Sequence, residues 1–342
     1  MPPATYAGIE MDTGYSFSLF DRTVAHRRPV WVTVLLVFIV YLPTLVVVVS
    51  VGLTDILTNP RSRSILTAPT AIAYILVIGP IMWSMQPKVI ASLRPIILVD
   101  DQELARVVRR SSSIPPLYEV AAIVGGLFFA FLISGGIPGP GERWHGYILA
   151  ATGYVMCGLL GWLGFTSIAN TRVISHLLRL PLRVDPLDIR PFEAIGRQSL
   201  VIAFAFIGGN TLALLLGNYG SAALADPRFW LLFAPLFLLP VVVFFLNMIP
   251  TQRVLSQAKN SELAAVRSEL HAAFRLLLQC RQAGEPTGSL SQDVDALASY
   301  EQHLNEARSW PYNPAILRTL IFGVLVPITT VLARRIFEVY IR

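Results

Sequence analysis

The chain has 342 residues, of which 54% are hydrophobic and 14% are charged. An average soluble protein has roughly 25% charged residues, so this chain has too few polar groups to cover a folded surface in water. The composition therefore excludes an ordinary water-soluble domain and favours a lipid bilayer as the surrounding solvent.

Six long uncharged runs dominate the sequence. A helix that crosses the hydrocarbon core, about 30 Å thick, needs about 20 apolar residues, and each of the six runs is long enough. The runs without Asp, Glu, Lys or Arg cover residues 29–54, 64–87, 120–141, 144–171, 198–225 and 229–252. They predict an all-α, polytopic membrane protein with a six-helix transmembrane domain over residues 30–252.

The basic residues are distributed unevenly among the predicted loops. Residues 1–29, the second and fourth loops and the segment after the sixth run hold 19 Lys and Arg, whereas the other three loops hold four. Because Lys and Arg concentrate on the cytoplasmic side of a membrane, residues 1–29 are expected to be a cytoplasmic N-terminal segment. The net charge of +6 follows from this bias, so anionic inner-leaflet lipid is expected as a partner and nucleic acid is not. We expect a multi-pass protein of a prokaryotic plasma membrane.

A short motif returns at the inner end of every second run. QPKVIASL, NTRVISHL and TQRVLSQA place Lys88, Arg172 and Arg253 in equivalent positions. A repeat of this kind usually means that one supersecondary unit is used several times, and it predicts three transmembrane helical hairpins. The first two copies also align beyond the motif, where Asp100 corresponds to Asp185. A basic residue at any inner helix end remains the alternative explanation, because it complements the helix dipole and the lipid phosphates.

Polar residues inside the runs are few. Asn210 and Asn247 are the best candidates, and they either hydrogen-bond between helices or face a wet cavity. We find no Asp, Glu or His at the middle of a run, which argues against a proton-coupled carrier. Glycines at steps of three, such as Gly158, Gly161 and Gly164, predict close helix packing.

The sequence contains no recognisable catalytic or ligand-binding motif. It lacks the spacings typical of zinc hydrolases, serine hydrolases and phosphate-binding loops. Cys157 lies inside the fourth run and Cys280 in a polar segment, positions that argue against a disulfide or a metal site. We therefore expect no enzyme activity, no metal and no cofactor.

Residues 253–309 have the pattern of a soluble helical hairpin. Two stripes of apolar residues recur at steps of three and four, with a Gly- and Pro-containing segment between them. The stripes comprise Leu263, Val266, Leu270, Phe274 and Leu277, and Leu290, Val294, Leu297, Tyr300 and Leu304. We expect a cytoplasmic antiparallel hairpin that also packs on loops or on sister subunits.

Residues 310–342 begin with an interfacial break and end with an apolar helix. Pro311 and Pro314 stop a helix, while Trp310 and Tyr312 are residue types that settle at the membrane interface. The apolar run 319–333 is only 15 residues long, so the terminal helix either crosses the membrane or lies along its surface, and crossing is favoured.

This layout resembles the insect odorant and gustatory receptor superfamily of tetrameric cation channels. The resemblance covers nearly the whole chain as topology and includes WPYNPAILRTLIFGVLVPITTVLARRIF, but it rests on no shared motif. It implies a tetramer, an intracellular anchor before the last span, and a pore lined by the last helix. Candidate pore-lining residues are then Thr319, Thr329 and Thr330. The chain is also similar to prokaryotic polytopic proteins that have a Trp-Pro-aromatic step.

Three functional hypotheses follow. The first is an oligomeric channel or channel-like receptor with the final helix near the pore axis. Gating by a ligand is one form of this hypothesis. The second is a sensor or scaffold without a pore that acts through the cytoplasmic hairpin. The third is a small-molecule carrier with a central site beside Asn210 and Asn247.

Overall fold

A computed structural model describes residues 29–52, 54, 62, 64–112, 115–217, 227–283, 286–307, 310, 318, 321–323, 325 and 329. Over these residues the elements are helical, and six helices are long and apolar enough to cross a membrane. The predicted all-α class and the six long apolar helices are thus confirmed, and they indicate a multi-pass membrane protein. The long helices are α1 (Val30–Val51), α4 (Thr67–Trp83, continued by α5, Gln86–Leu93), α7 (Pro116–Ser134), α8 (Trp144–Leu177), α9 (Arg190–Leu216) and α11 (Pro227–Ala283).

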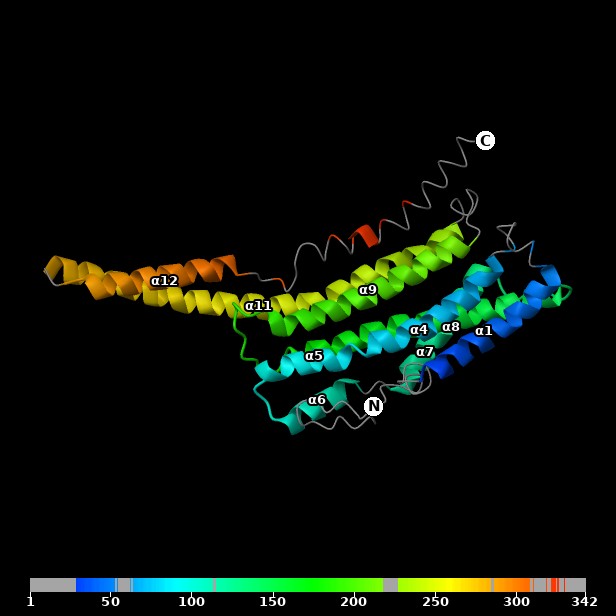
Figure 1. Cartoon of the computed structure of the whole chain (residues 1–342), viewed down its shortest axis with the longest axis horizontal. Coiled ribbons are helices and arrows are strands. Elements are labelled where there is room, and N and C mark those ends of the chain that lie inside the picture. The colour runs from blue at the N-terminus through cyan, green and yellow to red at the C-terminus, as the bar shows by residue number, and fades with distance from the viewer. Residues whose placement is uncertain are drawn as a thin grey trace, which may run out of the picture.

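The long helices form three side-by-side pairs, each made of two helices that are consecutive in the chain. Helix α1 packs on α4, α7 along α8, and α9 along α11, while α4 also contacts α8 and α9 (Figure 1). Helix α1 presents much of its apolar surface outward, for example Phe38 and Val49, which are 62% and 76% exposed. Such a surface is unfavourable in water and suits contact with lipid.

Glycine makes the α7–α8 contact unusually close. A methyl group at Gly161 would lie 2.6 Å from the Ala122 carbonyl oxygen, and one at Gly126 would overlap the carbonyl of Cys157. The two backbones therefore touch where the predicted small-residue stripe faces α7. This geometry is typical of helix pairs in lipid, where packing and not the hydrophobic effect joins the helices.

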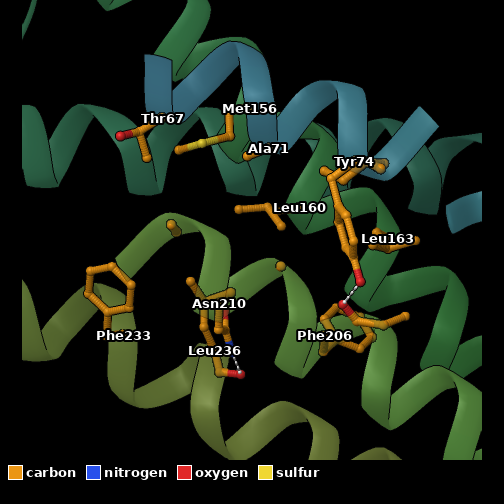
Figure 2. Close-up of a pocket in the computed structure, with 14 residues that line it drawn as sticks. Thr67, Ala71, Tyr74, Met156, Leu160, Leu163, Phe206, Asn210, Phe233 and Leu236 are labelled. Carbon is orange, nitrogen blue, oxygen red and sulfur yellow. Dashed lines mark hydrogen bonds between the residues drawn. The ribbon is translucent and has the colours of Figure 1, made fainter. Parts of the chain in front are cut away.

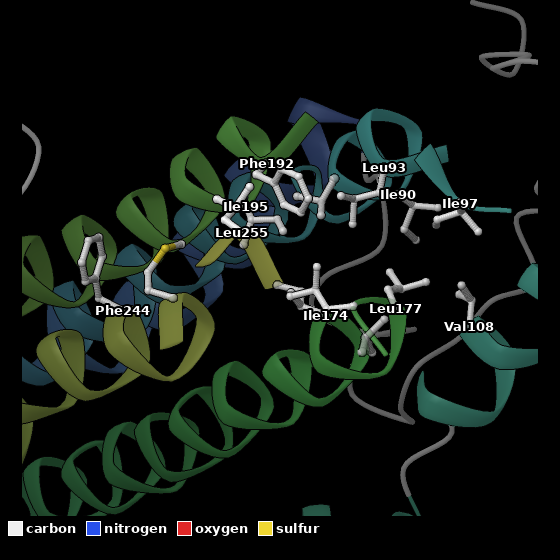
Figure 3. Packing of buried hydrophobic residues seen from close by; sticks show 14 of the residues in the cluster. Ile90, Leu93, Ile97, Val108, Ile174, Leu177, Phe192, Ile195, Phe244 and Leu255 are labelled. Atoms are coloured by element: carbon white, nitrogen blue, oxygen red, sulfur yellow. The ribbon is translucent and has the colours of Figure 1, made fainter. Parts of the chain in front are cut away.

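An apolar cluster fills the end of the bundle at which α5 lies, called here the inner end, where α5, α8, α9 and α11 meet (Figure 3). The opposite end is called the outer end. Its members include Ile90, Leu93, Ile97, Leu104, Val108, Ile174, Leu177, Phe192, Ile195, Phe244, Met248 and Leu255. A second cluster lies further out and includes Ile75, Met82, Trp162, Leu163, Ile202, Phe206 and Val243. The bundle thus has an inner and an outer apolar core.

The second predicted loop is partly helical. It contains the end of α5 and an amphipathic helix, α6 (Asp101–Ser112), of which Leu104 and Val108 are buried in the inner cluster. Acidic residues in its first turn and basic residues in its last turn complement the helix dipole. Leu104 and Val108 are four residues apart in an otherwise charged segment. This spacing could have predicted a helix that packs on the inner end of the bundle.

The two aligned loops pair with each other. Ile97 and Leu182 form an antiparallel bridge, in which the Leu98 N–H donates to the Pro181 carbonyl over 3.1 Å and the Arg183 N–H donates to the Ile96 carbonyl over 2.8 Å. In the alignment of the first two motif copies, these two hydrogen bonds are equivalent to one another. The loops of the first and second copies are therefore related by a local two-fold axis.

Helix α11 extends without interruption through 57 residues. The predicted boundary between the transmembrane domain and the hairpin, at residues 252 and 253, falls inside this helix. Pro235, Pro240 and Pro250 lie within it, as Pro43 and Pro80 lie within α1 and α4. Figure 1 shows the end of α11 and helix α12 (Gly288–Glu306) projecting beyond the end of the bundle at which α5 and α6 lie.

Helices α11 and α12 form the projecting pair, called here the distal hairpin (residues 253–306). Leu263, Val266 and Leu304 are buried between the two helices, and Leu297 and Tyr300 pack against them. At the base of the hairpin, the Lys259 ammonium donates to the carbonyls of Asn305 and Ala307 over 2.8 and 2.7 Å. A cation here satisfies carbonyls at the end of α12.

Most of the terminal segment falls outside the described residues. Pro311, Tyr312, Pro314, Thr319 and Thr330 are among those not described. Trp310 is 39% exposed and Thr329 is helical and exposed. A methyl group at Gly323 would lie 3.3 Å from side-chain atoms of both Phe204 and Ile207, so this part of the segment lies against α9.

Candidate functional site

A pocket opens between four helices in the outer half of the bundle (Figure 2). Its cavity volume is about 50 Å³. The lining comes from α4, α8, α9 and α11 and includes Ala71, Tyr74, Met156, Leu160, Leu163, Phe206, Asn210, Phe233 and Leu236. This wall is almost entirely apolar, which suits a small apolar ligand or a lipid chain.

Two polar side chains of the pocket, those of Tyr74 and Asn210, bond to the backbone of a neighbouring helix, whereas the buried Thr67 hydroxyl has no hydrogen-bond partner in the described part of the chain. The Tyr74 hydroxyl donates to the Ala205 carbonyl over 2.8 Å, because Gly208 and Gly209 let the ring lie against α9. A methyl group at Gly208 would lie 2.5 Å from the Tyr74 hydroxyl oxygen. Two glycines therefore allow a tyrosine from α4 to cross to α9 and close one side of the pocket.

Asn210 compensates for a proline on the opposite side of the pocket. Its Nδ2 donates to the Leu236 carbonyl over 2.7 Å. Pro240 has no N–H, so the carbonyl four residues earlier, that of Leu236, loses its intrahelical donor. The Asn210 side chain supplies this missing bond from α9, as neighbouring helices do for prolines in membranes, and it ties the kinked part of α11 to the pocket wall.

The structure separates the two predicted interior asparagines. Asn210 lies at the pocket, whereas Asn247 is 1% exposed, is not part of the pocket lining, and is eleven residues further inward along α11 from Leu236. The pocket therefore includes one of the two asparagines and not the other, and a carrier site beside both stays a prediction.

The three repeated basic residues share one environment. Lys88, Arg172 and Arg253 are all exposed, and each is followed two positions later by a buried residue, Ile90, Ile174 or Leu255. The motif therefore has the same orientation in all three copies. The three basic residues are exposed at the inner end of the bundle.

Glu119 is a buried carboxylate that the sequence argument did not identify. It lies just before an uncharged run, in the first turn of α7, and is 2% exposed. Gly161 of α8 faces Ala122 of α7. Because the two helices are antiparallel, Glu119, three residues before Ala122, lies at the level of Gly164, three residues after Gly161. Its position could have been noticed in the sequence, because an acidic residue one turn inside a long apolar helix usually has a functional role.

The described residues contain no group of three His, Cys, Asp or Glu side chains that could hold a metal ion. Cys157 is buried and Cys280 is partly exposed, and neither forms a disulfide. Of the predicted pore-lining residues, Thr319 and Thr330 lie outside the described part of the chain.

Comparisons with protein-family models, with curated proteins and with solved structures found no match to this chain. Its class is accordingly defined by its own features: an all-helical protein with six helices long and apolar enough to span a membrane, an apolar pocket among four of them, and a projecting helical hairpin.

Proposed function

We propose that this protein is a multi-pass membrane receptor that binds a small apolar ligand in the pocket and transmits its presence to the distal hairpin. The observation that carries the proposal is the continuity of α11. Phe233 and Leu236 of this helix line the pocket, and Leu263 and Val266 of the same helix form the core of the distal hairpin. Because one helix joins the pocket to the hairpin, a change in its tilt or bend at the pocket moves the hairpin.

The proposed orientation places the distal hairpin in the cytoplasm of a prokaryotic cell. The six long helices lie in the plasma membrane, and the outward-pointing Lys88, Arg172 and Arg253 meet anionic lipid of the inner leaflet. The N-terminal segment is then cytoplasmic, and the pocket lies in the outer half of the bilayer. A ligand dissolved in the membrane or arriving from outside can reach it.

The proposed coupling acts through the proline kink of α11. Asn210 holds the carbonyl that Pro240 leaves without a backbone donor, and both Asn210 and Leu236 line the pocket. A ligand that displaces this side chain or wedges against Phe233 changes the bend at Pro240. Because a proline removes one backbone hydrogen bond, the helix is easier to bend here than elsewhere. The distal hairpin then moves relative to the bundle.

Ligand binding can be tested with the full chain in lipid nanodiscs and 1-aminoanthracene, a small apolar fluorophore, as the probe. We expect saturable binding that Ala71→Phe removes, since Ala71 lines the pocket. Ala151→Phe is the matched control, because Ala151 is an exposed residue of α8. Equal binding by the two variants would place the probe outside the pocket and contradict the proposed ligand site.

Coupling can be tested with spin labels at Ser84 and Ser268, in a background of Cys280→Ser. Ser84 follows α4 at the bundle and Ser268 is exposed on the distal hairpin. We expect saturating probe to shift the distance distribution between the two labels. Binding without any shift would leave the pocket a ligand site and remove the proposed output.

A channel is the second candidate, in which the same receptor forms a homotetramer around the terminal helix. The close approach of Gly323 to Phe204 and Ile207 favours it, because that contact brings part of the terminal segment against the bundle, as a pore helix requires. Thr319, Thr329 and Thr330 are then the proposed pore-lining residues. The test combines the oligomeric state in mild detergent with conductance in planar bilayers, and a lone monomer would contradict this candidate.

A further inference from the structure

Three amide side chains are buried in the bundle with polar atoms that make no hydrogen bond. Gln86 is 3% exposed, Gln198 1% and Asn247 1%. Within the described part of the chain, no partner is found for Gln86 Nε2, for Gln198 Oε1 and Nε2, or for Asn247 Oδ1. Buried polar atoms are almost always hydrogen-bonded in proteins, so four such atoms require an explanation.

The helix registers place these amides at one depth. Asn210 bonds to Leu236 between α9 and α11. Twelve residues inward from Asn210 is Gln198, and eleven residues inward from Leu236 is Asn247. Since both helices advance about 1.5 Å per residue, the two amides reach nearly the same level.

The register between α5 and α9 adds Gln86. The Ser92 hydroxyl donates to the Pro191 carbonyl over 3.1 Å. Six residues outward from Ser92 is Gln86, and seven residues outward from Pro191 is Gln198. Helix α9 packs against both α5 and α11, so Gln198 belongs to the helix that contacts the other two. We call Gln86, Gln198 and Asn247 the amide layer.

Apolar side chains close the amide layer on both sides. Along the chain, Gln86 stands between Met82 of α4, in the outer cluster, and Val89 of α5, in the inner cluster. Along α9, Gln198 stands in the same way between Ile202 and Ile195. The layer is therefore an isolated polar zone between two apolar cores, and its occupant must be small.

Hydroxyl groups of the same zone leave acceptor capacity for an occupant. Thr251 is fully buried, and its hydroxyl donates to the Asn247 carbonyl over 3.1 Å. The buried Ser199 hydroxyl donates to the Ile195 carbonyl over 2.9 Å. Each hydroxyl oxygen can still accept a hydrogen bond. The zone thus offers both donors and acceptors to a neutral molecule.

We propose that the amide layer binds a small cluster of water molecules. The unpaired amide atoms comprise two donors and two acceptors, a set that water satisfies because it donates and accepts equally. An anion would use only the donors and a cation only the acceptors, and the amides themselves carry no charge. This site is distinct from the ligand pocket, so the inference stands or falls independently of the proposed receptor function.

Hydration gives the layer a mechanical role next to Pro250. This proline lies three residues beyond Asn247 in α11, and a proline weakens the helix locally. Water molecules can change hydrogen-bond partners, so the buried amide atoms stay hydrogen-bonded when the helices move. The amide layer therefore lets α11 shift against α9 at this depth while the apolar cores on either side stay closed.

X-ray hydroxyl-radical footprinting of the full chain in nanodiscs tests the proposal. Bound water is converted to hydroxyl radicals in place, and these oxidise nearby sulfur. Met248 is 0% exposed and follows Asn247, so bulk solvent does not reach it. We expect oxidation of Met248 in the wild type, with a decrease of at least about threefold in Gln198→Leu/Asn247→Leu, which lacks the polar atoms that hold water. The control, Gln257→Leu, alters an exposed residue of α11 and should leave oxidation unchanged.

Absence of Met248 oxidation in the wild type would overturn the proposal, as would equal oxidation in the layer variant. A second measurement covers variants that fold poorly. If water occupies the layer, Gln198→Leu removes a hydrogen-bond partner from the bound water molecules and lowers the unfolding temperature. If the layer is dry, the same change removes unpaired amide atoms from an apolar core and raises it. An organic molecule that copurifies with the wild type and is lost from the layer variant would replace water as the occupant and also overturn the proposal.

Discussion

The α7–α8 contact and the distal hairpin are both antiparallel helix pairs, yet different forces hold them. In α7–α8 the backbones touch at Gly126 and Gly161, with no room for a methyl group. In the distal hairpin the helices are spaced by a few buried residues, Leu263, Val266 and Leu304, and by contacts open to solvent such as Arg267 with Glu301. Exposed ion pairs contribute little.

The difference follows from the solvent expected around each pair. Lipid offers no hydrophobic gain when two apolar helices meet, so close backbone approach must provide the attraction. Water rewards the burial of each leucine, so a thin apolar stripe is enough to join two otherwise polar helices. Substitutions should therefore break the first pair by adding atoms and the second by removing them.

The largest effect is expected when an atom is added at the α7–α8 contact. Gly126→Ala would force a methyl group onto the Cys157 carbonyl, and backbone cannot move aside as a flexible side chain can. We expect a loss of about 3 kcal/mol, at the upper end for overpacking, measured by unfolding in detergent. Gly125→Ala is the control, since nothing lies within 4 Å of its added methyl group. Equal stability of the two variants would show that the close contact is absent.

Removal of apolar atoms should break the distal hairpin. Leu304 is 0% exposed, and Leu304→Ala leaves a cavity in a core with few other members. We expect a loss of about 2 kcal/mol, observed as faster hydrogen exchange in residues 288–306 with the bundle unaffected. Leu278→Ala, at a residue that is 53% exposed, should have little effect. If Leu304→Ala also accelerated exchange in α7 and α8, the hairpin would not be an independent unit.

The contribution of the Asn210 hydrogen bond to the free energy of unfolding should depend on Pro240. Asn210→Leu removes the donor that satisfies the Leu236 carbonyl, and we expect a loss of about 1 kcal/mol. Pro240→Ala restores the backbone donor, so in that background Asn210→Leu should cost much less. A double-mutant cycle of unfolding free energies measures this coupling. Additive effects would mean that the asparagine does not compensate for the proline.

The smallest effect concerns pH and the distal hairpin. Burial and the nearby Glu262 carboxylate raise the pKa of Tyr300 above its ordinary value of 10.0, and the Tyr300 hydroxyl donates to Glu262 over 3.3 Å. Folding thus favours the protonated phenol, so this contribution is complete below pH 10 and is lost as the pH rises through the raised pKa. After division by the intrinsic base-catalysed exchange rate, we expect lower protection of α12 amides above pH 10, and a weaker pH dependence of that protection in Glu262→Gln. An identical pH dependence in that variant would contradict the role of Glu262.

Local patterns in the sequence determined the long apolar helices. The long runs without charge required helices of membrane length, and the motif around Lys88, Arg172 and Arg253 predicted three copies of a helical hairpin. All three basic residues are exposed. The apolar stripes after residue 253 predicted two helices, and the structure packs Leu263 and Val266 against Leu304. Hydrophobic period is a property of neighbouring residues, so it can be seen without a fold.

Tertiary structure decided the features that depend on the register between distant helices. The sequence did not show that Asn210 faces the carbonyl freed by Pro240, that Ile97 pairs with Leu182, or that Gln86, Gln198 and Asn247 share one depth. It suggested a boundary at residue 252 because polarity changes there, yet α11 continues, since none of its prolines ended the helix. It also left Glu119 at the end of a span. Which polar atoms meet in a bundle is set by how whole helices slide against one another, and no local pattern carries that information.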